Sequence, residues 1–350
     1  MEIDKRENLK ISEEFLPFNN FLNYCRRCLM DMVEYADKHE LKKEPIHYRS
    51  DNDRKCVEKI FKSKVEDTDK WLINNGYKDV IYNFYYKHLF ISLLVDFFNY
   101  YSASLDMAFS RNINVAWALL RKPFQETLAY IEWLYVDKDE LLTLMIEGND
   151  VNSYEIMRDK NKIRKHINLI RPYNTSCPLD MFEFRYSYKE RETLNGMFQA
   201  TNHLITTSPV LKTFPSGLNF VFTNDETFYR NTGLYYTSLP YIMEYAMEVI
   251  MKIFGDIAEL SDYTVTINYL NMMLKAFQVI SYSDGYEKIK ELLDLENTYV
   301  YCPTCGKLHN SDEIWERFAY GDYECSSCHR KIDTHQYLFD FEDSTFVFDD

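Results

Sequence analysis

A helical period dominates this chain from about residue 13 to about residue 295, and it constrains the fold more than any other feature. The first predicted helix, from about residue 12 to 39, has an apolar face made of Phe18, Leu22, Cys25, Leu29 and Met32. Further helices are predicted over residues 53–75, 80–110, 112–136, 153–170, 188–206, 225–254, 263–281 and 284–295. The sequence therefore predicts a mainly α body.

The predicted helix over residues 80–110 is apolar on nearly every side. A helix of this kind either lies in the centre of a fold or forms part of an oligomer interface. The sequence leaves both positions open.

The composition agrees with a globular protein, because 46% of the 350 residues are hydrophobic and 16% are aromatic. The net charge is −15, so any contact with nucleic acid must come from a local basic patch. No apolar run is long enough to span a membrane. The N-terminal residues also lack the apolar segment of a signal peptide, and we expect a cytoplasmic protein.

The pattern changes near residue 296, where short aromatic and β-branched runs replace the helical period. We therefore expect three parts. Residues 1–76 form N-terminal helices that pack on a bundle, residues 77–295 form the helical bundle itself, and residues 296–350 form a small β-type tail.

The tail contains two C-x2-C pairs, Cys302 with Cys305 and Cys325 with Cys328, separated by 19 residues. This spacing is typical of a zinc ribbon, in which four thiolates close the coordination shell, so a structural Zn²⁺ is expected. The second pair also fits the C-x-x-C-H pattern of haem attachment, but its matching partner pair favours zinc. Between Asn297 and Asp350 the chain carries four Lys or Arg and eleven Asp or Glu, a net charge of −7, which favours a protein partner over nucleic acid.

The remaining cysteines give no further metal pattern. Cys25 and Cys28 form a C-x-x-C on a helix outside any βαβ setting, and core packing is favoured for them. Cys56 and Cys177 have no partner in the sequence and are expected to be inert.

A polar stripe follows the predicted helix around residues 111–135, and it consists of Arg111, Asn114, Arg121, Gln125 and Glu132. If the helix stays regular across Pro123, Glu126 falls among apolar side chains and needs a buried partner or a raised pKa. Pro123 is also expected to kink the helix. The stripe is either a solvated helix face or a polar seam against another helix or subunit.

The segment Leu119-Leu-Arg-Lys-Pro-Phe-Gln-Glu-Thr-Leu, followed by Ile131-Glu-Trp-Leu and Asp137-Lys-Asp-Glu, resembles the central Arg-x4-Glu helix of a group of bacterial proteins. That group is similar to the HEPN superfamily of helical RNA-binding and RNA-cleaving domains. The resemblance implies an up-and-down helical bundle, often a homodimer, in toxin–antitoxin or phage-defence systems. Active members carry an Arg-x4-6-His motif, which the helical body of this chain lacks.

Two sets of residues are candidates for function. Arg121, Glu126 and His203 would be the catalytic residues of a metal-independent endoribonuclease, although His203 is also explained as a solvated surface residue. The most basic run would contact RNA or an acidic partner, unless it is a solvated helix face, and it includes Arg158, Lys160, Lys162, Arg164 and Lys165.

The favoured hypothesis is a zinc-binding, HEPN-like protein of bacterial stress or phage defence that acts as a protein- or RNA-binding or assembly module. The alternative is the toxin-like endoribonuclease. Phosphate-binding glycine loops, Gly-x-Ser-x-Gly and His-Glu-x-x-His are missing from the sequence, so nucleotide hydrolases, esterases and zinc proteases have no support.

Overall fold

The computed structural model describes residues 11–62, 65–148, 150–170, 180–187, 193–205, 216–218, 225–280, 299–310, 314, 317–319 and 321–339. Within these ranges the fold is mainly α, with a small antiparallel β module near the C-terminal end, as predicted. None of the helices in the described ranges is both long and apolar enough to cross a membrane.

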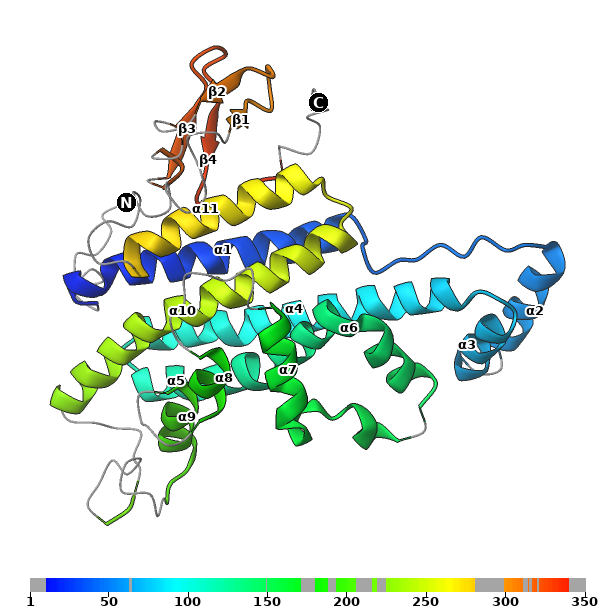
Figure 1. The fold of residues 1–350 in the computed structure, drawn as a ribbon, viewed down its shortest axis with the longest axis horizontal. Coiled ribbons are helices and arrows are strands. Elements are labelled where there is room, and N and C mark those ends of the chain that lie inside the picture. Colours follow the sequence, from blue (N-terminus) through cyan, green and yellow to red (C-terminus); the bar gives the residue numbers. More distant parts are fainter. Residues whose placement is uncertain are drawn as a thin grey trace.

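The body is a bundle of long helices arranged in two layers (Figure 1). One layer contains α1 (Leu16–Lys38), α10 (Asp225–Ile257) and α11 (Asp262–Ile280), which pack against one another. The other contains α4 (Lys78–Phe109), α5 (Ile113–Arg121) and α6 (Leu128–Ile146). Because α4 packs against α1, α5, α6 and α10, its apolar character on all sides is explained by a central position.

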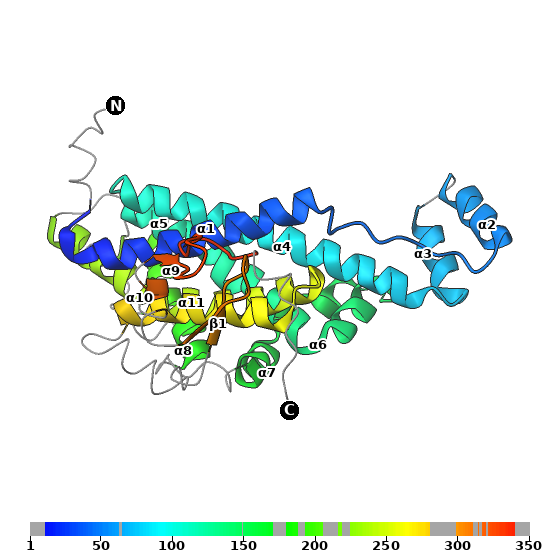
Figure 2. The ribbon, with the colours of Figure 1, turned by 90° about the horizontal axis from the view of Figure 1, so that it is seen from above.

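A small helical pair stands apart from this bundle at the N-terminal end of α4 (Figure 2). It consists of α2 (Asp51–Phe61) and α3 (Val65–Asn74), where one continuous helix over residues 53–75 was predicted. The Ser50 hydroxyl caps α2 by accepting a hydrogen bond from the backbone N–H of Asp53. After α3, Gly76 adopts a left-handed conformation (φ +86°), as expected for a helix-terminating glycine. The pair has its own small apolar cluster of Val57, Leu72, Tyr77 and Ile81.

The predicted kink at Pro123 takes the form of a π-helical segment, Lys122–Thr127, between α5 and α6. Proline supplies no backbone N–H, and the wider π turn adapts the helix to this loss. Beyond the π turn α6 continues ten residues past the predicted end at 136, with non-helical backbone at Asp137 (φ −154°, ψ 72°).

Three shorter helices pack against α5, α6 and the π turn between them. They are α7 (Lys160–Ile170), α8 (Met181–Tyr186) and α9 (Leu194–Asn202). The helix predicted from residue 153 begins only at Lys160, after two 3-10 turns, Val151–Tyr154 and Ile156–Arg158. Parts of the predicted helix 188–206, all of helix 284–295, the boundary near residue 296 and Cys177 lie outside the described residues.

The β module contains two hairpins. β1 (Tyr299–Tyr301) pairs with β2 (Leu308–Asn310), and β3 (Asp322–Glu324) pairs with β4 (Lys331–Asp333), both antiparallel. We call this module, with the residues up to 339, the ribbon. Its buried side chains, Val300, Phe318, Tyr323, Ile332 and Leu338 among them, belong to the same continuous apolar cluster as the bundle. The ribbon is therefore packed onto the body and shares its core.

Candidate functional site

The four ribbon cysteines converge on one point. The Sγ atoms of Cys302, Cys305, Cys325 and Cys328 all lie within 4.8 Å of one another. Cys302 and Cys328 are 3.6 Å apart and Cys305 and Cys325 are 3.7 Å apart, too far for a disulfide. A tetrahedral ion with Zn–S bonds of about 2.3 Å would hold its sulfurs about 3.8 Å apart. The cysteines present therefore fit a four-thiolate metal centre.

The two cysteine turns have the same local structure. In the first, Cys302 N–H donates to the carbonyl of Lys307, and Gly306 N–H donates to the carbonyl of Cys302. In the second turn, Cys325 N–H donates to the carbonyl of Arg330, and His329 N–H donates to the carbonyl of Cys325. The residue after each pair has positive φ, +67° at Gly306 and +57° at His329. Each turn thus aims two sulfurs at the same side, as a metal knuckle requires.

Hydrogen bonds favour the thiolate form of Cys325. Burial alone would raise the pKa of Cys325, but the backbone N–H groups of Cys328 and Ser327 and the His309 ring lower it to about 5. His309 Nε2 lies 3.3 Å from the Cys325 sulfur and is itself buried. Because metals bind thiolates, this environment prepares Cys325 as a ligand.

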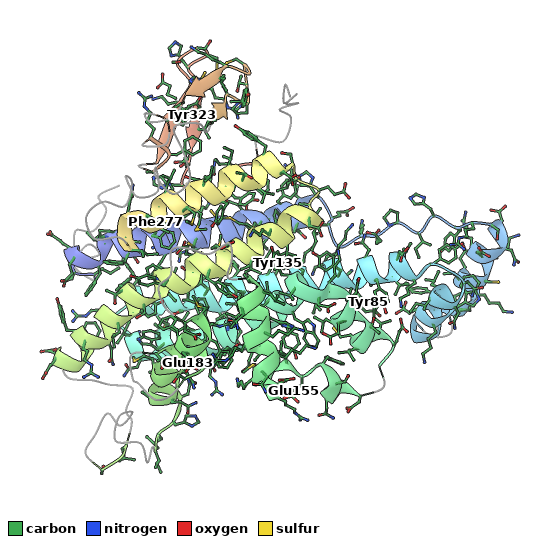
Figure 3. All side chains as sticks on the ribbon, in the orientation of Figure 1. Tyr85, Tyr135, Glu155, Glu183, Phe277 and Tyr323 are labelled. Carbon is green, nitrogen blue, oxygen red and sulfur yellow. The ribbon has the colours of Figure 1, made fainter. Side chains whose placement is uncertain are left out.

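Buried polar contacts join the ribbon to α11. Asn271 Nδ2 donates to the carbonyl of Thr334 at 2.9 Å, and Asn268 exchanges two hydrogen bonds with the backbone of Leu338, at 2.9 and 2.7 Å. Both asparagines are fully buried. Figure 3 shows the ribbon residue Tyr323 above Phe277 of α11. These bonds fix the orientation of the ribbon on the bundle.

Lys275 forms the centre of this interface. Its Nζ donates to the carbonyl of Phe318 and, at 3.3 Å, to the hydroxyl of Thr334. Burial lowers the pKa of Lys275 to about 8, against the opposing effects of Cys28 and Asp333. A cation at this depth depends on the carbonyl that the ribbon provides.

The predicted polar stripe is buried in the region of the π turn, so its interpretation as a solvated face is wrong there. Asn114 accepts a hydrogen bond from Asn231 of α10, and Gln125 donates to Asn195 of α9. Asn114 and Gln125 are each about 5% exposed, and Glu132 is fully buried. The stripe is a seam against α8, α9 and α10 of the same chain.

Arg185 of α8 is the central residue of this seam. Its guanidinium pairs with Glu132 and donates to the carbonyl of Phe124 (2.8 Å) and to the hydroxyl of Tyr186 (3.0 Å). Arg185 and Glu132 are both 0% exposed. Burial raises the pKa of Glu132, although Arg185 and a 2.6 Å hydrogen bond from Tyr245 oppose the shift. The pair therefore locks the π turn to α8 and α10.

Above the seam, Lys160 of α7 lies over a ring that is bonded to the π turn. Lys160 Nζ lies 4.1 Å from the ring centroid of Tyr186, whose hydroxyl donates to the carbonyl of Gln125. Reduced hydration and the charges of Arg185 and Arg121 lower the pKa of Lys160, and Glu126 opposes this shift. Arg121 Nε is enclosed and has no hydrogen-bond partner among the residues that the structure describes.

Within the described residues, no carboxylate forms an ion pair with Arg121 or Lys160. A regular helix was expected to enclose Glu126 among apolar side chains. In the structure Glu126 is half-buried instead, because the π turn shifts the helix faces. We call Arg121, Glu126 and Lys160 the π-turn site.

The remaining members of the basic run behave differently. Arg158 pairs with Glu155, Lys162 with Glu140 (2.8 Å) and Arg164 with Glu183. Glu155 and Glu183 lie beside α7 (Figure 3). Two of these cations also rest on rings, Lys162 on Trp133 and Arg164 on Phe182. Lys165 is exposed. Intramolecular carboxylates thus neutralise much of the run.

His203 lies away from the π-turn site. It follows the last residue of α9 and is exposed. The helix α9 runs antiparallel to α5, because Asn195 contacts Gln125 while Phe198 lies against Trp117. His203 consequently lies toward the start of α5, at the end opposite Arg121.

His166 of α7 is a buried residue that the sequence did not single out. It is 3% exposed, and its ring packs 5.8 Å from Trp133. Burial, assisted by the charge of Lys162, lowers the pKa of His166 to about 4. An unfolded chain protonates histidine near pH 6.5, so protons favour the unfolded state between pH 6.5 and 4.

We expect the protein to lose roughly 2 kcal/mol of stability from His166 alone between pH 7 and pH 5. The contribution is fully present above pH 6.5 and is lost as the pH falls toward 4. Urea unfolding at both pH values measures it. Between pH 7 and pH 5 a His166→Leu variant should lose about that much less unfolding free energy than the wild type. A His47→Gln variant, changed at an exposed position, should show the same pH dependence as the wild type. Equal pH dependence in His166→Leu and wild type would contradict this assignment.

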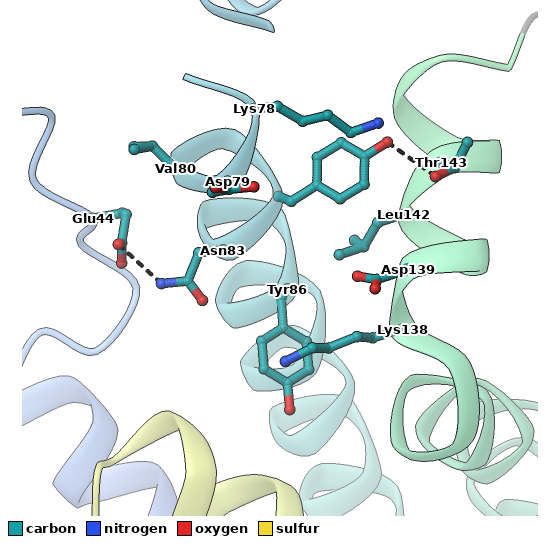
Figure 4. Close-up of a pocket in the computed structure, with 11 residues that line it drawn as sticks. Glu44, Lys78, Asp79, Val80, Asn83, Tyr86, Lys138, Asp139, Leu142 and Thr143 are labelled. Carbon is teal, nitrogen blue, oxygen red and sulfur yellow. Dashed lines mark hydrogen bonds between the residues drawn. The ribbon is translucent and has the colours of Figure 1, made fainter. Parts of the chain in front are cut away.

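A cleft of about 550 Å³ lies between the N-terminal half of α4 and the C-terminal half of α6 (Figure 4). Most of its charged groups are already paired. Lys78 binds Glu147 at 2.8 Å, and Glu44 binds Lys87 at 2.6 Å and the Asn83 amide at 2.9 Å. These ion pairs hold α4, α6 and the segment after α1 together, so the cleft has a structural explanation.

Comparisons with protein-family models, with curated proteins and with solved structures find no match to this chain.

Proposed function

We propose that this protein is an RNA-binding module, a helical bundle whose fold is completed by a structural Zn²⁺ bound to the four ribbon cysteines. The fit of the sulfur spacing to a tetrahedral thiolate site supports zinc as the metal. Because four thiolates close the coordination shell, the metal stabilises the fold and leaves no open position for catalysis. One equivalent of zinc in the purified protein, measured by elemental analysis, is the expected result.

The observation that carries the RNA proposal is the pair of cations at the π-turn site. Within the described residues neither Arg121 nor Lys160 forms an ion pair, while Arg158, Lys162 and Arg164 of the basic run are each paired with a carboxylate. The Tyr186 ring and the seam below it support Lys160. Guanidinium and ammonium groups are the side chains that bind phosphate oxygens best.

Binding is better supported than cleavage. The endoribonuclease alternative required His203 beside Arg121 and Glu126, and the antiparallel packing of α9 on α5 separates them. The resemblance to HEPN domains adds a context of bacterial stress or phage defence and a homodimer to the proposal. It also leaves a role for the ribbon in contacting a partner protein.

Fluorescence anisotropy with a labelled single-stranded RNA at low salt tests the proposal. Arg121→Ala and Lys160→Ala should each weaken binding about tenfold and lower the salt slope by about one. Lys162→Ala is the matched control on the same helix, because Lys162 is already paired with Glu140. RNA binding that is absent in the wild type, or equally weakened by all three variants, would refute the proposal. Incubating total RNA with the wild type and His203→Ala reveals any cleavage.

A further inference from the structure

Each exposed sulfur of the ribbon lies next to a buried sulfur of the opposite cysteine turn. Cys305 and Cys328 are exposed, whereas Cys302 and Cys325 are at most 1% exposed. The sulfur of Cys305 lies 3.7 Å from that of Cys325, and the sulfur of Cys328 lies 3.6 Å from that of Cys302. The four thiols can therefore be grouped as two pairs, in each of which one sulfur is open to solutes and the other is enclosed.

Two side-chain hydrogen bonds also join the cysteine turns directly. Lys307 of the first turn donates to the hydroxyl of Ser326 in the second turn at 3.3 Å. In return, Arg330 of the second turn donates to the hydroxyl of Thr304 in the first turn at 2.7 Å. Neither bond involves a sulfur atom, so both help to keep the sulfurs of opposite turns close together when the thiolates lose their metal.

This arrangement suits oxidation of the thiolates by a small peroxide. A thiolate attacks one oxygen of hydrogen peroxide, which gives a sulfenic acid and a hydroxide ion. A second thiolate then attacks the sulfenic sulfur, forms a disulfide and displaces another hydroxide ion. The first step needs a sulfur that the peroxide can reach, and the second needs a neighbouring thiolate. The exposed member of each pair meets the first condition, and its buried neighbour meets the second.

We propose that hydrogen peroxide converts the four-thiolate zinc centre of the ribbon into two disulfides, Cys305–Cys325 and Cys302–Cys328. Each pair of thiolates loses two electrons to one hydrogen peroxide, which is reduced to two hydroxide ions, and the thiolates release the Zn²⁺. Each pair of sulfurs closes by about 1.6 Å to reach the disulfide bond length. This inference rests on the zinc site of the proposed function and does not depend on RNA binding.

The choice of partners decides what happens to the ribbon. Disulfides between the turns keep the two hairpins covalently joined, so the oxidised ribbon stays folded on α11 without its metal. Disulfides within a turn, Cys302–Cys305 and Cys325–Cys328, would leave the hairpins without a covalent connection. The proposed pairing therefore exchanges one crosslink of the ribbon for another as the redox conditions change.

Peptide mapping of the oxidised protein tests the pairing. The zinc-loaded protein is treated with two equivalents of hydrogen peroxide, blocked with iodoacetamide and digested with trypsin. Trypsin places the first cysteine pair in the peptide 291–307 and the second in the peptide 318–330. We expect these peptides to be linked and lighter by four hydrogens than their sum, whereas disulfides within a turn give two separate peptides. Fragmentation between the two cysteines of each peptide identifies the partners.

Zinc release and thermal unfolding test the exchange itself. A chromogenic indicator should detect one equivalent of released zinc when two equivalents of peroxide have reacted. The oxidised protein should have a higher Tm than reduced protein that has been stripped of zinc by a chelator, because its turns remain joined. Dithiothreitol followed by zinc should restore the original zinc content.

A Cys305→His variant separates the two pairs. Histidine replaces one cysteine in many zinc sites, and this position is exposed, so the variant should keep its zinc. Peroxide should then form only the Cys302–Cys328 disulfide and leave Cys325 as a thiol that iodoacetamide blocks. Cys56→Ser is the matched control, because it changes a cysteine outside the ribbon and should react like the wild type.

The results that would overturn the inference differ from those that would overturn the zinc site. Disulfides confined to single turns would reject the proposed pairing. Zinc that stays bound after peroxide treatment, or thiols that are oxidised to sulfinic acids without a disulfide, would reject the exchange. Purified protein that contains no zinc before peroxide is added would refute the zinc site on which the inference rests.

Discussion

Replacement of Cys325 by serine is expected to abolish metal binding, unfold the ribbon and destabilise the helical bundle beneath it. Structural zinc binding contributes about 10–16 kcal/mol in small domains, as much as the whole stability of a typical protein. The consequences extend to the body, because Asn268, Asn271 and Lys275 lose their ribbon partners. The apolar side chains of α1 and α11 that pack on the ribbon would also become exposed to water.

Zinc content and thermal unfolding followed by circular dichroism measure this effect. We expect no bound zinc and a fall in Tm of more than about 10 °C. Treating the wild type with a strong chelator should give the same result. Cys56→Ser is the matched control, because Cys56 is half-buried on α2 and is not a metal ligand. A Cys325→Ser protein that melted like the wild type would show that the ribbon adds no stability to the bundle.

Replacement of Arg185 by methionine is expected to cost about 3–5 kcal/mol of unfolding free energy. The change leaves Glu132 as an uncompensated charge in a fully buried position, and it also removes the donors to Phe124 and Tyr186. Glu132→Leu alone should also be destabilising, since it leaves the buried Arg185 cation without its carboxylate partner. The double variant should recover much of the loss, because neither charge then remains buried.

Urea unfolding of the two single variants and the double variant completes the cycle. Arg164→Met is the control, because the exposed pair between Arg164 and Glu183 should contribute less than about 1 kcal/mol. If the double variant lost as much unfolding free energy as the two single variants together, the two buried charges would act independently. Arg185→Met should also weaken RNA binding, since the Tyr186 ring that supports Lys160 depends on Arg185.

Several residues important to this structure gave no signal in the sequence. Arg185, Asn268, Asn271 and Lys275 are single polar residues within helices, and any of them would be expected at a solvated position. Their burial follows from partners that are 43 to 70 residues away along the chain. A helical period identifies the apolar face of a helix, but it does not reveal which polar residue meets a partner across an interface.

The sequence by itself determined the mainly α body, the small β-type tail and the set of four cysteines, because periodicity and ligand spacing are local properties of a chain. Only the tertiary structure decided how these parts combine. It buried most of the polar stripe, separated His203 from Arg121, placed Lys160 over the Tyr186 ring beside the π turn, and merged the ribbon with the core. The π turn at Pro123 shows the physical reason, since one locally wider turn changed which side chains face the interior, and the packing of distant helices then fixed that choice.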